Sequence, residues 1–146
     1  MEKQLISKDI ILFNLDATSK EDIIYHMSNA MEADGRLLNK DGYIKDVLTR
    51  ESTSSTAIGF SVATPHAKST HVKFPSLAFA RLKTPILWDD EEVEIIFQIG
   101  VPSPGQGDRH LEILSKLFRN LVHQEFLHTL LHAQNEEEIL NLLQEF

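Results

Sequence analysis

The sequence predicts an α/β fold, a single domain with a central mixed sheet flanked by helices. Hydrophobic residues recur at helical spacing before residue 50 and after residue 108, whereas they alternate with polar or small residues in between. The chain has 146 residues, 42% of them hydrophobic, which suffices for one hydrophobic core. Because no repeat, low-complexity tract or linker divides it, we expect one domain over residues 1–146.

The first third of the chain is expected to hold a short strand and two helices. Residues 10–13 are apolar and predict the strand or an ordered entry segment. Ser19, followed by acidic residues, is typical of a helix start, and Gly35 is a natural stop for that helix. A second helix is predicted from Lys40 to about Arg50. Its core-facing residues are Tyr43, Ile44, Val47 and Leu48.

The pattern then changes to a period of two. Phe60, Val62 and Thr64 alternate with small residues and predict a strand that ends at Pro65. We therefore expect His66 just past the end of a strand, with its ring presented at a surface.

Two further strands and a loop are predicted next. Residues 77–82 form an extended apolar run, and residues 93–101 alternate strictly, with Glu94 and Gln98 on the opposite side. Residues 102–107 hold two prolines and two glycines, which predicts a loop.

The last third is expected to be helical. Asp108 can cap a helix, a second helix is expected from about Glu125, and Asn135 with three glutamates is typical of the start of a last one. The residues expected to be buried by the first two of these helices are Leu111, Leu114, Leu117, Phe118, Leu121, Phe126, Leu127, Leu130 and Leu131.

Composition excludes several classes of function. The chain carries 14 basic and 22 acidic residues, a net charge of −8, which argues against nucleic-acid binding. It has no cysteine, which excludes disulfides and thiolate chemistry. No segment approaches the roughly 18 apolar residues of a membrane span, and the start lacks the apolar stretch of a signal peptide. We expect a cytoplasmic protein that does not insert into a membrane.

One group of residues predicts a site that handles a phosphoryl group. His66 offers a neutral, nucleophilic nitrogen near pH 7, and Arg50 has a planar fork of donors suited to phosphate oxygens. Residues 52–56 are all serine or threonine and supply hydroxyl groups. The alternative is that Arg50 only stabilises a helix end, residues 52–56 form a solvated turn, and His66 is a surface residue.

His110 is the second candidate. It falls in the first turn of a predicted helix, where free N–H groups favour a bound anion and lower the pKa of a histidine. The alternative is a hydrogen-bonded histidine at the edge of the core.

A histidine-ligated metal hydrolase is the enzyme alternative, with His66, His71 and His110 as ligands. His128 and His132 have the i, i+4 spacing of a zinc pair, but no glutamate follows the first histidine as the zincin motif requires. We therefore predict no metal site.

Three segments in order carry a family resemblance: Val47–Glu51, Thr56–Gly59 and Val62–Ala67. They resemble the enzyme IIA domains of the bacterial phosphoenolpyruvate-dependent sugar phosphotransferase system, fructose/mannitol type, which includes a nitrogen-regulatory branch. The segments that continue the resemblance in the family's order are Pro85–Trp88, Val93–Val101 and His110–Leu111.

The resemblance implies a role for each candidate. His66 would accept a phosphoryl group from the phosphocarrier protein HPr and pass it to an enzyme IIB domain of a membrane sugar transporter. His110 would assist, Arg50 and Thr56 would bind the phosphoryl group, and no metal or cofactor would be needed. The alternative within the family is a regulatory module in which phosphorylation switches partner affinity.

Two departures from the family pattern bear on loop geometry. Ala57 stands where many relatives have glycine, so this loop is expected to adopt positive φ less readily. Thr64 stands where many have isoleucine or valine. Neither departure removes a group that handles phosphate.

Overall fold

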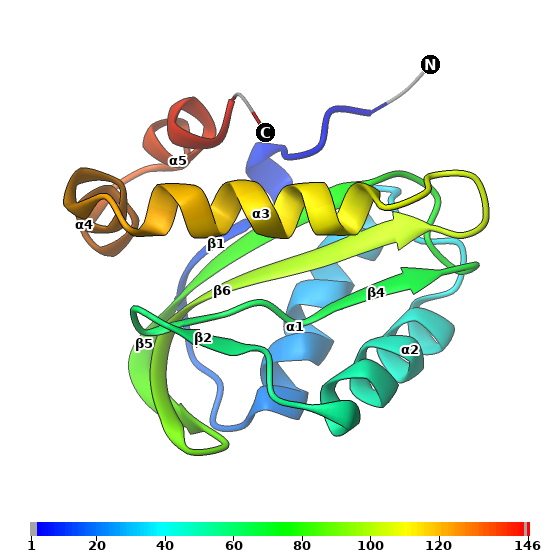
Figure 1. Ribbon diagram of the computed structural model, residues 1–146, viewed down its shortest axis with the longest axis horizontal. Coiled ribbons are helices and arrows are strands. Elements are labelled where there is room, and N and C mark those ends of the chain that lie inside the picture. The colour runs from blue at the N-terminus through cyan, green and yellow to red at the C-terminus, as the bar shows by residue number, and fades with distance from the viewer. Residues whose placement is uncertain (1–2, 145) are drawn as a thin grey trace.

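The computed structural model describes residues 3–144 and 146, and it has a mixed six-stranded sheet with helices on both faces (Figure 1). The helical elements are η1 (Lys8–Ile10), α1 (Lys20–Ala33), α2 (Lys40–Thr53), α3 (Arg109–Leu121), α4 (Gln124–His132) and α5 (Glu136–Leu143). The strands are β1 (Ile11–Leu15), β2 (Ala57–Gly59), β3 (Val62–Ala63), β4 (His66–Ser69), β5 (Ser76–Trp88) and β6 (Glu91–Pro102). The predicted α/β class is confirmed. None of the helices in the described part is long and apolar enough to cross a membrane.

The order of the strands is β1-β5-β6-β3-β2, and β4 also pairs with β6. The long strands β5 and β6 are antiparallel, whereas β3 and β4 both run parallel to β6. β3 pairs with Ile95 and Ile96, and β4 pairs with β6 from Ile99 onwards. β3 and β4 therefore follow one another along the same edge of β6, with only Thr64 and Pro65 between them.

This arrangement corrects the expected position of His66. Phe60 and Ser61 do not open a strand, because both have positive φ and form the tight turn between β2 and β3. Pro65 has no N–H and interrupts the pairing with β6, but pairing resumes at once. His66 is the first residue of β4, opposite Ile99, and is buried.

Ala57, which stands where many relatives have glycine, does not adopt a positive φ in this structure. Ala57 lies in β2, and the positive φ angles of this hairpin fall at Gly59, Phe60 and Ser61 instead.

The ends of the helices are defined largely as predicted. The Ser19 hydroxyl accepts the backbone N–H of Asp22, and Gly35, with φ of 74°, allows the chain to leave α1. Asn135 caps α5 in the same way. Asp108 stands at the N-cap of α3 but makes no side-chain capping bond, and α2 continues beyond Arg50 to Thr53.

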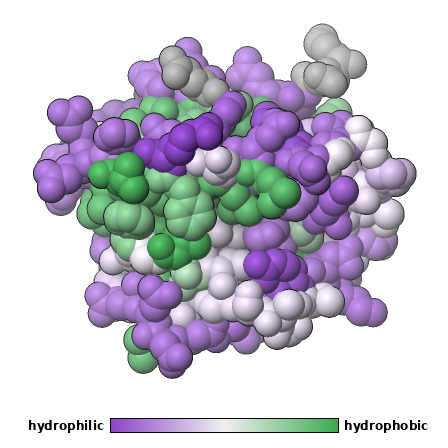
Figure 2. Space-filling view, in the orientation of Figure 1, coloured by the Kyte–Doolittle hydropathy of each residue, from purple (hydrophilic) through white to green (hydrophobic). Residues whose placement is uncertain are grey.

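The apolar face of α3 is only partly the predicted one, because Leu117 and Leu121 are buried and Leu114 is half-buried as part of the core. Ile113, Leu117 and Leu121 recur at four-residue spacing and are buried, whereas Leu111 and Phe118 are 52% and 45% exposed. Each residue turns by about 100° around a helix, so a stripe centred on Leu117 leaves Leu111 and Phe118 on its flank. A hydrophobic patch is visible along α3 in the space-filling view (Figure 2).

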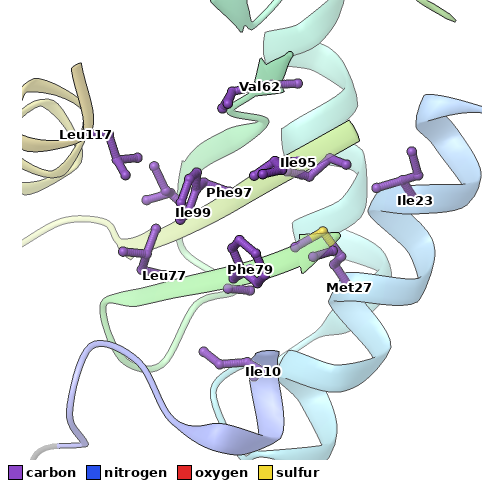
Figure 3. Close-up of a cluster of buried hydrophobic side chains, with 14 of the residues drawn as sticks. Ile10, Ile23, Met27, Val62, Leu77, Phe79, Ile95, Phe97, Ile99 and Leu117 are labelled. Carbon is purple, nitrogen blue, oxygen red and sulfur yellow. The ribbon is translucent and has the colours of Figure 1, made fainter. Parts of the chain in front are cut away.

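Helices cover both faces of the sheet, which explains why a polar residue of β6 is buried. Gln98, expected opposite the apolar residues of β6, is itself buried, and its amide donates to Ser28 of α1. Leu117 of α3 lies on one side of the β5–β6 pair, and α1 residues such as Met27 lie on the other (Figure 3). The sheet is therefore the middle of three layers, and its free edge beside α2 and the start of α3 carries β4.

Candidate functional site

A shallow pocket of about 460 Å³ opens where α2, β4 and the start of α3 converge. The residues that line it are Asp46, Thr49, Arg50, His66, Ala67, Lys68, Ser69, Thr70, Ser103 and His110. Three of the four predicted site residues, His66, His110 and Arg50, are thus brought together from segments that lie far apart in the sequence.

The His66 ring is held in one orientation by a backbone carbonyl. Its Nδ1 lies 2.8 Å from the carbonyl oxygen of Thr64, two residues earlier. Because a carbonyl can only accept a hydrogen bond, Nδ1 must carry the proton. In the neutral ring, the lone pair is therefore on Nε2.

The surroundings of His66 favour this neutral form. The residue is only 8% exposed. Burial lowers the pKa of His66 below its ordinary value, and the Thr64 carbonyl opposes this effect. The charge of Arg50 lowers the pKa further, as does His110 when it is protonated, and the carboxylate of Glu51 raises it. Near pH 7 the imidazole is uncharged and nucleophilic.

Arg50 lies in the last turn of α2. One guanidinium nitrogen donates to the carbonyl oxygen of Ser54 at 2.9 Å, closing the helix end, and the side chain lines the pocket. Since a guanidinium has five N–H donors, this single bond leaves most of its donor capacity available for a bound anion. Arg50 thus closes the end of α2 and also lines the pocket, and its binding of a phosphoryl group stays a prediction.

His110, the second residue of α3, stacks near His66. The two ring centroids are 6.1 Å apart, with an interplanar angle of 28°. Its Nδ1 is buried and has no hydrogen-bond partner among the described residues. Burial lowers the pKa of His110, and the positive charge of Lys68 lowers it further, so this ring is also neutral near pH 7.

Thr56 lies behind the pocket and does not line it. Its hydroxyl donates to a carboxylate oxygen of Glu51 at 2.6 Å, and its N–H donates to the other oxygen at 2.9 Å. The expectation that the Thr56 side chain contacts phosphoryl oxygens is therefore corrected. The hydroxyls of Ser52 and Thr53 also turn away, since both donate to the carbonyl oxygen of Thr49 within α2.

Lys68, Ser103 and Asp46 line the pocket but were missed from the sequence. Lys68 follows His66 by two residues in β4, and the alternation of a strand puts both side chains on one face. That signal was hidden because no strand was expected after Pro65. Asp46 precedes Arg50 by four residues on α2 and accepts the hydroxyl of Ser69 at 2.6 Å.

The three histidines of the metal-hydrolase alternative do not meet. The His71 ring lies against the backbone of Gly42 on α2, away from the pocket that holds His66 and His110. Over the described residues, 3–144 and 146, no three histidine, aspartate or glutamate side chains are grouped closely enough to hold a metal ion.

Comparison with known proteins gives one consistent family. Residues 4–146 match the family model described as phosphoenolpyruvate-dependent sugar phosphotransferase system, EIIA 2. A fructose-specific EIIA component of Haloferax volcanii is 36% identical over 132 residues, covering 88% of this chain and 84% of the relative. Multiphosphoryl transfer protein 2 of Escherichia coli is 34% identical over 140 residues, covering 96% of this chain and 17% of the relative. The chain thus spans only about a fifth of several of the curated relatives it matches.

Solved structures agree with the architecture. Nitrogen regulatory protein IIA-Ntr of Neisseria meningitidis superposes with a TM-score of 0.85 at 27% identity, covering 95% of this chain and 96% of that one. The mannitol IIA domain of E. coli, solved in complex with its phosphorylated IIB, shares the fold with a TM-score of 0.82 at 19% identity and full coverage of both chains. The resemblance inferred from the ordered motifs is confirmed, and the chain belongs to the EIIA 2 family of the phosphoenolpyruvate-dependent sugar phosphotransferase system.

Proposed function

We propose that this chain is a phosphocarrier that accepts a phosphoryl group on Nε2 of His66 from phosphorylated HPr and passes it to an enzyme IIB domain for sugar uptake. The observation that carries the proposal is the His66 ring itself. Its Nδ1 is engaged by the Thr64 carbonyl, so its free nitrogen is left for a pocket lined by an arginine and a second histidine. The family supports the same role, and a mannitol IIA relative has been solved with a phosphorylated IIB.

The chemical step is an exchange of one nitrogen–phosphorus bond for another. The Nε2 lone pair of His66 attacks phosphorus, the bond to the donor imidazole breaks, and its electron pair returns to the donor ring. Attack makes the His66 ring more positive, which strengthens the bond from its Nδ1–H to the Thr64 carbonyl. Because the bonds made and broken are alike, the transfer is reversible and needs no metal or other cofactor.

Arg50 and His110 serve the phosphoryl oxygens. The guanidinium of Arg50 neutralises the charge spread over the equatorial oxygens in the transition state. Since Nδ1 of His110 has no acceptor, the proton of its neutral ring belongs on Nε2, which donates to one oxygen. The two stacked histidines thus use opposite tautomers, one to attack and one to donate.

The surface around the pocket suits a large partner. Leu111 and Phe118 on α3 and Val122 directly after it are exposed, the last to 64%. The other residues that we place at the rim are Phe60, which is exposed, Phe74, which is half-buried, and the loop Pro102–Gly107, which is exposed from Pro104 onwards. We assign these residues to the rim on which HPr and enzyme IIB dock, with the domain working in the cytoplasm.

A regulatory role is the second candidate, favoured by the likeness to IIA-Ntr. In that case, phosphorylation of His66 changes the affinity for a partner instead of feeding transport. Pull-downs with the phosphorylated and unphosphorylated forms, alongside an uptake assay, separate the two roles.

Incubation with phosphoenolpyruvate, enzyme I and HPr tests the proposal. Mass spectrometry is expected to find one acid-labile phosphoryl group on the wild-type chain and none on the His66→Gln variant. A variant that still takes up the phosphoryl group would show that His66 is not the acceptor.

A further inference from the structure

We infer that Glu51 is a positioning residue for His66, acting through Thr56 and Thr64 to keep the proton on Nδ1. Glu51 is buried at the end of α2 and does not line the pocket. The inference deepens the proposed function and rests on it only for the consequence in phosphoryl transfer.

The first link is the carboxylate of Glu51. One oxygen accepts the Thr56 hydroxyl at 2.6 Å, and the other accepts the Thr56 N–H at 2.9 Å and the Trp88 indole N–H at 3.1 Å. Hydrogen bonds to an ionised carboxylate are stronger than those between neutral groups. Thr56 is therefore held by both its backbone and its side chain.

The second link joins Thr56 to Thr64. The carbonyl oxygen of Thr56 accepts the N–H of Thr64 at 2.9 Å and the Thr64 hydroxyl at 3.3 Å. Two bonds to one oxygen set the place of Thr64, and all of these groups are buried. The Thr64 carbonyl is then the acceptor for His66 Nδ1, across Pro65, whose ring restricts the intervening backbone.

The consequence for chemistry lies in the tautomer. A neutral imidazole has one proton and two nitrogens, and only the form protonated on Nδ1 has its lone pair on Nε2. A Thr64 carbonyl that moves away from Nδ1 lets the proton occupy Nε2, where it blocks attack on phosphorus. The carboxylate of Glu51 thus controls the fraction of protein molecules in which the lone pair of His66 is on Nε2.

Four variants test this relay. Glu51→Gln removes the negative charge and replaces one accepting oxygen by an NH₂ donor, so it weakens the first link. Thr56→Val removes only the Thr56 hydroxyl, and Thr56→Ser restores it. Trp88→Phe is the matched control, because it removes a donor from the same carboxylate without touching the bonds that lead to His66.

Two quantities are measured on each variant. Long-range ¹H–¹⁵N NMR of the unphosphorylated protein reports which nitrogen of His66 carries the proton, and single-turnover assays with phosphorylated HPr report the transfer rate. We expect the Nδ1–H form in the wild type, Thr56→Ser and Trp88→Phe, and a mixture of tautomers in Glu51→Gln and Thr56→Val. The rate should fall at least about tenfold in Glu51→Gln, as for a misplaced reacting group.

The outcomes discriminate clearly. A folded Glu51→Gln protein that retains the Nδ1–H form overturns the inference. Loss of the Nδ1–H form in Trp88→Phe also overturns the inference, because the effect would then come from a general loosening of the fold. If Glu51→Gln does not fold, the contrast between Thr56→Val and Thr56→Ser decides. A wild-type chain that accepts no phosphoryl group overturns the proposed function alone, because the tautomer is read without it.

Discussion

The two sides of the His66 ring differ in how their polar groups are used. On the Nδ1 side, Thr64, Thr56 and Glu51 are buried and bonded to one another. On the other side, in the pocket that His66 itself lines, Arg50 and His110 have donor capacity to spare. The contrast teaches that orientation and reactivity are assigned to separate groups, so that the pocket is preorganised before a phosphoryl group arrives.

The largest effect on the open side is expected from Arg50→Gln. Loss of the charge that neutralises the phosphoryl oxygens should lower the transfer rate by about 10²- to 10³-fold, as for removal of one preorganised donor. Arg50→Lys keeps the charge without the planar fork and should recover only part of the rate. Rapid-quench kinetics with phosphorylated HPr measure this, and a wild-type rate in Arg50→Gln would break the assignment of the open side.

His110→Gln should cost less. It removes one hydrogen bond to a charged oxygen, which corresponds to about 10- to 100-fold in rate. The same assay measures it, and urea unfolding provides the control, since the midpoint should change little at this half-exposed residue. If His110→Gln lowered the stability and left the transfer rate unchanged, His110 would have a structural role and no role in transfer.

Trp88→Phe tests the closed side through stability. The indole is buried and donates to Glu51, so its loss removes a hydrogen bond and leaves a small cavity. We expect the free energy of unfolding to fall by about 1–3 kcal/mol, while the transfer rate stays within about twofold. A large loss of rate at full stability would contradict the separation of the two sides.

Lys68→Gln should have a smaller effect. Its ammonium is exposed and lies on the same face of β4 as His66, so its contribution to a bound phosphoryl group is screened by salt. We expect a rate loss of roughly two- to fivefold at low ionic strength that shrinks as salt is added. A loss that does not depend on salt would indicate direct contact with the phosphoryl group.

The smallest effect is expected in the pH dependence of stability. Because the folded pKa of His66 is lowered, the unfolded chain binds a proton more readily. The contribution of His66 is therefore present above about pH 6.5 and is lost as pH falls through the lowered folded pKa. Urea unfolding of the wild type and His66→Gln across this range should show a weaker acid destabilisation in the variant. An equal loss in both would place the titrating group elsewhere.

The pH dependence of the transfer rate gives a second check on the pKa of His66. Its acid limb should lie below pH 6.5, and Arg50→Gln should move that limb toward higher pH, because the Arg50 charge helps to lower the pKa of His66.

Much of this arrangement could be predicted from the sequence, and the failures have physical causes. The sequence predicts that His66, His110 and Arg50 share a site, and the structure places all three around one pocket, whereas their roles, which the family resemblance implies, stay predictions. The return to strand pairing at His66 could not be predicted, since proline signals the end of a strand, and whether pairing resumes depends on β6. For the same reason Lys68 was missed.

Residues whose role depends on distant partners were the hardest to predict. The family resemblance implies that Thr56 binds the phosphoryl group, but in this structure its hydroxyl is buried and donates to Glu51. Leu111 and Phe118 have the spacing of core residues, yet the sheet contacts a narrower stripe of α3 than the pattern includes. Sequence periodicity does not report where a neighbouring layer ends.

The position of the phosphoryl group on the His66 ring tests the central claim most directly. After phosphorylation by HPr, ¹H–¹⁵N and ³¹P NMR of the intact chain should show phosphorus bonded to Nε2 of His66, with the Nδ1 proton still present and hydrogen-bonded. Phosphorus on Nδ1, or on any other histidine, would contradict the account, because the Thr64 carbonyl would then not define the nucleophile.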